Sequence, residues 1–147
     1  MKKREKEIFM LETAERFSNF SKDPTTKVGA IICDKNYRVL SSGYNGLPSK
    51  FPDDYSNISR EEKHLISIHA EVNAILNAAK NGVNLSNSTI YASEHPCANC
   101  TAAIVNAGIT RIVLREKTNL SLSTWGKSLE MSEKIIEECK IELVKLS

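Results

Sequence analysis

The sequence predicts an α/β domain in which helices lie on the faces of a mixed β-sheet. Three observations support this fold class. A helical segment comes first, a predicted β-hairpin follows it, and β-rich runs then alternate with helical segments. The 147 residues contain no internal repeat, low-complexity tract or linker, so we expect residues 1–147 to form one domain.

The first elements are a helix and a hairpin. Residues 5 to about 20 place apolar side chains along one helical side, and the breaker sequence KDPTTK ends this helix. Residues 28–34 and 37–45 are apolar runs separated by a Lys-Asn pair, which predicts a β-hairpin.

A long segment from residue 46 to about 66 follows the hairpin. It holds Gly46, Pro48, Pro52 and many charged residues. An irregular stretch of this length inside a compact domain more often carries function than fills space. We therefore expect a functional loop without regular structure.

Strands and helices alternate through the second half of the chain. We expect them at 69–80 (helix), 88–93 (strand), 98–107 (helix), 111–115 (strand), about 125–139 (helix) and 141–146 (strand). In such sheets ligands favour the crevice at strand ends and helix N-termini.

Composition narrows the class of protein. Apolar content is 41% and charged content is 26%, as in ordinary soluble globular proteins. The formal net charge of +2 is too small to argue for a nucleic-acid or membrane surface. No apolar run approaches the ~18 residues of a membrane span. Glutamates interrupt the basic start, so it does not resemble a signal peptide. We expect a cytoplasmic protein without membrane or nucleic-acid partners.

The cysteines predict a metal site, because an intracellular protein keeps them as thiols or metal ligands. Cys97 and Cys100 lie three residues apart at a predicted helix start, hence on one face, where thiolates are favoured. Two thiolates are half of a tetrahedral zinc site, and His69 at another helix start is the best further candidate. Three protein ligands leave a fourth position open, as in catalytic zinc sites. We interpret Cys33 and Cys139 as small buried apolar residues.

His69 and Glu71 stand at the head of an apolar-periodic helix, where a core normally excludes charges unless they are paired or bound to metal. We expect both to be buried, His69 as a zinc ligand and Glu71 beside a zinc-bound water. Zinc lowers the pKa of such a water toward ~7. Glu71 can then carry its proton to a ring nitrogen and to leaving ammonia.

Each motif also has a plainer interpretation. Cys97 and Cys100 could form a redox pair, and Glu71 could only complement the helix dipole. Asn45 precedes a glycine and could only shape a turn. Lysines in the predicted loops are ordinarily solvated.

The pattern H-x-E followed by P-C-x-x-C is the signature of zinc-dependent nucleobase deaminases. Through HAE (69–71) and PCANC (96–100), the chain resembles the cytidine deaminase-like superfamily. Further segments resemble the deoxycytidylate (dCMP) deaminase family: SKDPTTKVGAII (21–32), GYNGLP (43–48), HAEVNAIL (69–76) and AGITRIV (107–113).

The resemblance implies a three-layer α/β/α fold with a mixed five-stranded sheet. It implies hydrolytic deamination of dCMP to dUMP and ammonia, by attack of zinc-bound hydroxide on the amino-bearing ring carbon. His69, Cys97 and Cys100 would hold one catalytic zinc per chain, and Glu71 would shuttle protons.

The resemblance also implies substrate contacts. Asn45 would hydrogen-bond the sugar, Lys22 or Lys27 would lie near the nucleotide, and Ala70 would line the substrate site. Glu94 departs from the family pattern and would repel a phosphate if it faced the pocket.

Regulation is a further implication. Members of this family are commonly hexamers that dCTP activates and dTTP inhibits, so we expect a homo-oligomer. Gly43, Tyr44 and Gly46 lie in the region tied to effector binding, and a triphosphate effector would bring Mg²⁺. The segment after GYNGLP offers no cysteine or histidine cluster for the second, structural zinc of some relatives, since His64 stands alone.

Three other functions remain open. Deamination of a base in tRNA or single-stranded DNA would favour a basic, aromatic-rich surface, whereas aromatic residues make up 6% of this chain. Another free base, nucleoside or nucleotide could be the substrate instead of dCMP. A non-catalytic, zinc-stabilised domain is the alternative outside enzymes.

Overall fold

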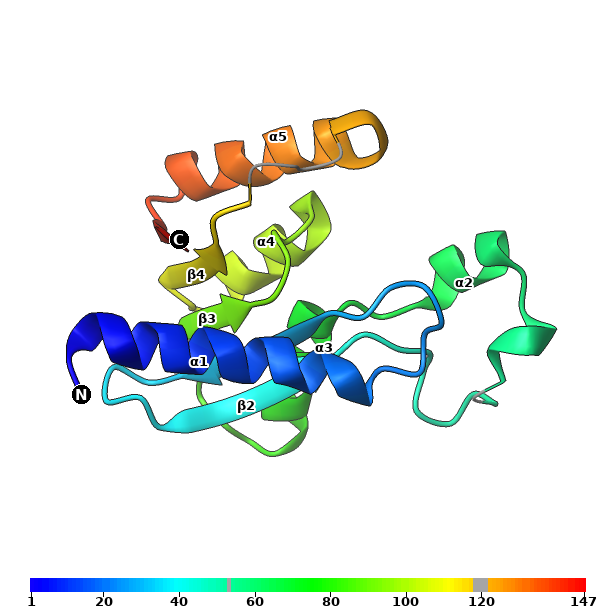
Figure 1. The fold of residues 1–147 in the computed structure, drawn as a ribbon, viewed down its shortest axis with the longest axis horizontal. Helices are drawn as coiled ribbons and strands as arrows, with labels where there is room; N and C mark the ends of the chain where they lie inside the picture. Colours follow the sequence, from blue (N-terminus) through cyan, green and yellow to red (C-terminus); the bar gives the residue numbers. More distant parts are fainter. Residues whose placement is uncertain (53, 118–121) are drawn as a thin grey trace.

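A mixed β-sheet forms the centre of the molecule. The computed structural model describes residues 1–52, 54–117 and 122–147, and in these residues the sheet has five strands in the order β2-β1-β3-β4-β5 (Figure 1). β1 runs antiparallel to β2 and β3, whereas β3, β4 and β5 are parallel. The strands are β1 (Gly29–Cys33), β2 (Val39–Tyr44), β3 (Thr89–Ala92), β4 (Arg111–Arg115) and β5 (Glu142–Leu146). The predicted α/β fold with a mixed five-stranded sheet is confirmed.

Helices cover both faces of this sheet. They are α1 (Lys3–Phe17), α2 (Arg60–Ile66), α3 (Ala70–Lys80), α4 (Ala98–Asn106) and α5 (Leu122–Glu138), with short 3₁₀ turns at Ser18–Phe20 and Tyr55–Asn57. In the described part of the chain, no helix is both long and apolar enough to cross a membrane.

α1 packs on one face of the sheet. Alternate strand residues point to opposite faces, so Ile31, Tyr91 and Val113 meet this helix. Its own contribution to the cluster is Met10, Leu11 and Ala14.

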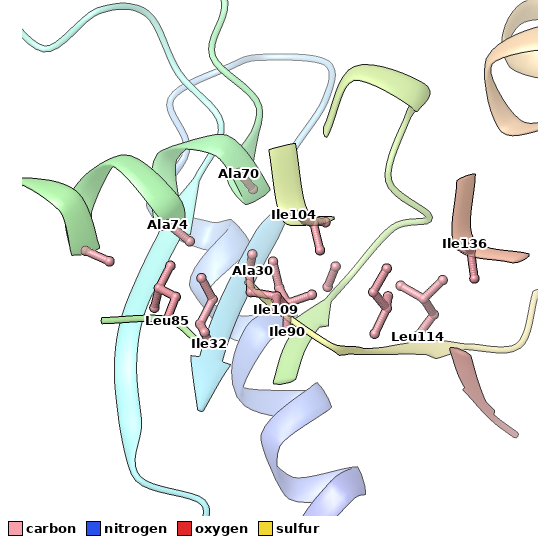
Figure 2. Packing of buried hydrophobic residues seen from close by; sticks show 13 residues of the cluster. Ala30, Ile32, Ala70, Ala74, Leu85, Ile90, Ile104, Ile109, Leu114 and Ile136 are labelled. Atoms are coloured by element: carbon pink, nitrogen blue, oxygen red, sulfur yellow. The ribbon is translucent and has the colours of Figure 1, made fainter. Parts of the chain in front are cut away.

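The other face carries α3, α4 and α5. Ala70 and Ala74 of α3 pack over Ile32 of β1, which small side chains permit at close range (Figure 2). Ile104 of α4 and Ile136 of α5 complete this larger core (Figure 2). The burial of these apolar side chains fixes the positions of α3 and α4 on the sheet.

The segment predicted to be an irregular loop contains regular structure. Residues 55–57 form a 3₁₀ turn and α2 follows it, so that part of the prediction is wrong. Ser59 Oγ accepts a hydrogen bond from the Glu62 amide, and the Glu62 carboxylate accepts one from the Ser59 amide, both at 3.0 Å. This capping box was a readable signal for the helix start. Cys139, expected to be buried, is exposed near the end of α5.

Candidate active site

The starts of α3 and α4 bring the two sequence motifs together. His69 is the N-cap residue of α3, and Cys97 is the N-cap residue of α4, following the end of β3. Cys100 lies three residues further along α4, so both thiols lie on the same side of its first turn. The core packing of α3 against α4 therefore sets the distance between the imidazole and the thiols.

Three potential ligand atoms converge at these helix starts. His69 Nδ1 lies 3.5 Å from Cys97 Sγ and 3.3 Å from Cys100 Sγ, and all three atoms lie within 4.8 Å of one another. Tetrahedral zinc with ordinary bond lengths would separate nitrogen and sulfur ligands by about 3.6 Å. The donor set and its spacing therefore fit a zinc ion that keeps a fourth position open.

The four motif side chains differ in exposure. Glu71 is 4% exposed and Cys100 is 2% exposed, as expected of groups beside a metal in the core. Cys97 is half-buried, and His69 is exposed, so the prediction that His69 is buried is wrong. An N-cap residue lies outside the body of its helix, and His69 lines a pocket instead of entering the core.

These groups perturb one another. Burial raises the pKa of Glu71 to about 7. A hydrogen bond with Cys100 lowers the pKa of Cys97 to about 4, while the same contact and burial raise the pKa of Cys100. A hydrogen bond with Cys97 raises the pKa of His69. The Glu71 carboxyl and the two thiols thus lie close to one another, and a divalent cation between them would stabilise their ionised forms.

A pocket of about 490 Å³ opens beside this cluster. That volume lies in the range of small-molecule sites. Its wall includes His69, Ala70, Glu71 and Cys97 of the motifs, so the predicted Ala70 position is at the pocket. Further lining residues come from the turn before β1, from α2 and from the ends of β3 and β4: Asp23, Thr26, Lys63, His64, Ser67, Glu94, His95 and Lys117.

Asn45 lines the same pocket and is 7% exposed. Its Nδ2 donates to the Thr26 carbonyl at 2.8 Å, and its Oδ1 accepts from the Val28 amide at 2.9 Å. The side chain therefore holds the turn that leads into β1. The second proton of Nδ2 can still serve a ligand.

The lysines predicted near the nucleotide do not line this pocket. Lys22 and Lys27 are exposed, and Lys27 Nζ donates to the Ser21 carbonyl. Lys63 and Lys117 lie on the pocket wall instead. No local sequence pattern marks either lysine, because each is held at the pocket by contacts with distant residues.

Glu94, which departs from the family pattern, lines the pocket, so its charge bears on phosphate binding. Its Oε1 lies 2.6 Å from Lys117 Nζ, which also donates to the Ser93 carbonyl at 3.3 Å. The lysine therefore offsets much of the carboxylate charge. The buried imidazole of His95, to which the sequence assigns no role, lies next to this pair on the pocket wall.

The GYNG residues have structural tasks. A Cβ atom on Gly43 would lie 2.4 Å from the Ala74 amide nitrogen, so the glycine permits β2 to pack closely on α3. Gly46 exchanges two backbone hydrogen bonds with Ile68, which joins the ends of the intervening segment. Tyr44 is 42% exposed and stacks on Phe20 with ring centroids 5.6 Å apart.

Comparison with known proteins identifies the family. Residues 3–116 match the model of the "Cytidine and deoxycytidylate deaminase zinc-binding region". The chain belongs to this deaminase family. The match includes both motifs and all the pocket residues named above except Lys117. The predicted family is therefore confirmed, and the protein is a hydrolase of the deaminase type.

The alignments with similar proteins cover nearly the whole chain of this deaminase. An uncharacterized deaminase of Aliivibrio fischeri is 37% identical over 132 residues, covering 90% of this chain and 87% of the relative. A probable deoxycytidylate deaminase of Drosophila melanogaster is 32% identical over 143 residues, covering 90% and 70%. The crystal structure of a dCMP deaminase from cyanophage S-TIM5, in complex with dCMP and dUMP, superposes with a TM-score of 0.79, at 28% identity and 99% coverage of both chains.

Proposed function

We propose that this pocket deaminates the cytosine base of dCMP, giving dUMP and ammonia. The observation that carries the proposal is the buried carboxyl of Glu71 beside the His69, Cys97 and Cys100 donor set, on the wall of a pocket of about 490 Å³. The similarity to a phage dCMP deaminase whose structure holds dCMP and dUMP supports this choice of substrate.

His69, Cys97 and Cys100 would hold one zinc ion. Zinc bound there would supply Lewis acidity, which makes a coordinated water acidic near neutral pH. The chain contributes the geometry, since the two helix starts hold the three donor atoms within 4.8 Å of one another.

Glu71 is the proton carrier in this proposal. In the metal-free protein burial raises the pKa of Glu71 to about 7, so this carboxyl gives up and takes back a proton more readily near neutral pH than an exposed glutamate does. It takes a proton from the attacking water and delivers it to the ring nitrogen next to the amino-bearing carbon. Glu71 then transfers the remaining hydroxyl proton of the added water to the amino group, which leaves as ammonia. In total, water and cytosine become uracil and ammonia.

Substrate orientation falls to the residues around the cluster. Ala70 lines the pocket beside Glu71, where the base would lie. Asn45 has the second Nδ2 proton for a sugar hydroxyl. Lys22 and Lys27 lie outside the pocket wall, and a part for either in nucleotide binding remains a prediction.

Regulation and assembly also remain predictions. A response to dCTP and dTTP, with Mg²⁺ carried by the triphosphate, would act through the segment of Gly43, Tyr44 and Gly46. A homo-oligomer, a hexamer by family resemblance, and a cytoplasmic location complete the proposal. Turnover with added effector and a solution mass from light scattering test the first two.

A substrate panel tests the proposed reaction. Zinc-loaded protein is incubated with dCMP, CMP, deoxycytidine, dCTP and a cytosine-containing oligonucleotide, and the products are separated by chromatography. Glu71→Ala serves as the blank. Conversion of dCMP in preference to the others supports the proposal. Conversion of the oligonucleotide alone, or of nothing, overturns it.

A further inference from the structure

A buried lysine forms part of the pocket wall. Lys63 of α2 has a side chain that is 11% exposed, and its Nζ lies 3.1 Å from Asp23 Oδ1 and 3.0 Å from Thr25 Oγ1. Lysines are almost never buried without a partner. This one is fixed in place by residues 40 and 38 positions earlier in the chain.

The ammonium of Lys63 keeps the capacity to bind a ligand. It has three protons, and two of them serve Asp23 and Thr25. The Asp23 oxygen that faces it also accepts hydrogen bonds from the Thr25 amide at 2.9 Å and the Thr26 amide at 3.1 Å. The negative charge of Asp23 is thus shared among several donors, and an anion in the pocket can still attract the lysine.

A short chain of contacts joins Lys63 to Asn45, the residue proposed to lie beside the sugar. The turn of residues 23–26 contacts Lys63 through Asp23 and Thr25, and it contacts Asn45 through the Thr26 carbonyl. With the base beside Glu71 and the sugar beside Asn45, the 5′ substituent continues along this wall. We propose that Lys63 binds the 5′-phosphate of the substrate and makes the pocket select nucleotides over nucleosides, an inference that rests on the proposed function.

The other lysine on the pocket wall is less suited to this task. Lys117 Nζ already lies 2.6 Å from Glu94 Oε1, and that carboxylate also lines the pocket. A phosphate approaching Lys117 would meet the like charge of Glu94. Asp23, the partner of Lys63, also lines the pocket, but it is 3% exposed and accepts hydrogen bonds from two backbone amides, which Glu94 does not have among the described residues.

The test compares ligands that differ only in the phosphate. Zinc-loaded wild type and Lys63→Met are titrated with dUMP and with deoxyuridine, and kcat/KM is measured for dCMP and deoxycytidine. Loss of one charge-assisted hydrogen bond should weaken dUMP binding and lower kcat/KM for dCMP about 10- to 100-fold. The values for deoxyuridine and deoxycytidine should stay unchanged. Lys80→Met, an exposed lysine in the last turn of α3, is the matched control.

The design separates binding from folding and from the reaction. A lysine that only tethers α2 would alter nucleotide and nucleoside values equally, and that result overturns the inference. Lys63→Met combined with Asp23→Asn removes both charges, so no unpaired carboxylate remains to destabilise the fold. A large loss in Lys117→Met with none in Lys63→Met also overturns it. The comparison of dUMP with deoxyuridine stands even if dCMP is not turned over, so failure of the proposed function is seen separately.

Discussion

Two clusters of buried ionisable side chains differ in how their charges are matched. At the start of β4, Arg111 forms an ion pair with Glu7 of α1, and Tyr91 donates its hydroxyl proton to the same carboxylate. Arg111 Nε also lies 3.0 Å from Glu142 of β5. Each charge in this cluster therefore has a protein partner, and the cluster ties α1 to three strands.

The cluster beyond the end of β3 is incomplete by comparison. Glu71 and the thiols of Cys97 and Cys100 lie next to one another and next to the His69 imidazole, with no Lys or Arg ion pair to any of them among the described residues. A buried carboxyl and two thiols in a pocket, with an imidazole as their basic neighbour, are typical of a functional site. We infer that the matched cluster stabilises the fold, whereas the cluster at the pocket is completed by the proposed zinc ion.

The largest expected effect comes from removing a metal ligand. Cys97→Ser should lose most of its bound zinc. Changes to residues that only support metal ligands lower activity about 10–100-fold, and turnover should fall further than that here. Metal analysis of purified protein, together with turnover of dCMP, checks this. Cys139→Ser, at an exposed thiol far along the chain, is the matched control and should keep both. Full zinc occupancy in Cys97→Ser would contradict the ligand assignment.

Breaking the matched cluster should affect stability instead of metal binding. Arg111→Met leaves Glu7 buried without its cation, which should cost about 3–5 kcal/mol of unfolding free energy while zinc binding is kept. Chemical denaturation measures the loss. Arg115→Met removes the bidentate pair with Glu15, whose side chains are 31% and 32% exposed, and should cost about 1 kcal/mol. Equal losses would mean that burial does not distinguish the two pairs.

The unmatched carboxyl predicts a pH dependence. Burial raises the pKa of Glu71 from 4.5 to about 7, so the folded metal-free protein favours the protonated form. Its contribution to stability is fully present below pH 4.5 and is lost as pH rises through about 7. Metal-free wild type should therefore lose roughly 3 kcal/mol relative to Glu71→Gln between these limits. Unfolding free energies measured from pH 4 to 8 check this, and parallel curves for the two metal-free proteins would contradict the prediction.

The smallest effect should come from the exposed pair at the pocket edge. Glu94 and Lys117 are 49% and 37% exposed, and pairs of this kind contribute at most about 1 kcal/mol. Glu94→Gln should therefore shift the midpoint of denaturation only slightly. A loss as large as that of Arg111→Met would show that the pair is part of the structural framework.

The sequence indicated which residues converge at the helix starts because each motif is local, and the structure brings His69, Cys97 and Cys100 together. The H-x-E and C-x-x-C spacings place side chains within the first turn of a helix, and the helices were readable from apolar periodicity, from the proline before the second and from the glycines after both. His69 was expected to be buried, yet as an N-cap residue it lines the pocket. Spacing fixes which side chains share the first turn of each helix, whereas the meeting of the two motifs and the exposure of His69 depend on the tertiary packing.

The substrate side of the pocket could not be predicted in the same way. Lys63 reaches Asp23 across 40 positions, and Lys117 reaches Glu94 across 23, so no local pattern marks either pair. α2 itself was missed because charges and prolines before it outweighed the Ser59 capping box. The matched cluster of Glu7, which spans α1, β3, β4 and β5, could likewise not be seen before the fold was known.

The central claim is that Glu71 moves protons in a zinc-dependent deamination at this pocket. Ammonia release from dCMP should be measured side by side with zinc content for wild type and Glu71→Gln, which keeps the shape of the side chain. We predict equal zinc in both proteins and a fall in turnover of about 10²–10⁴-fold in the variant. Turnover near the wild-type rate, with zinc retained, would contradict the account.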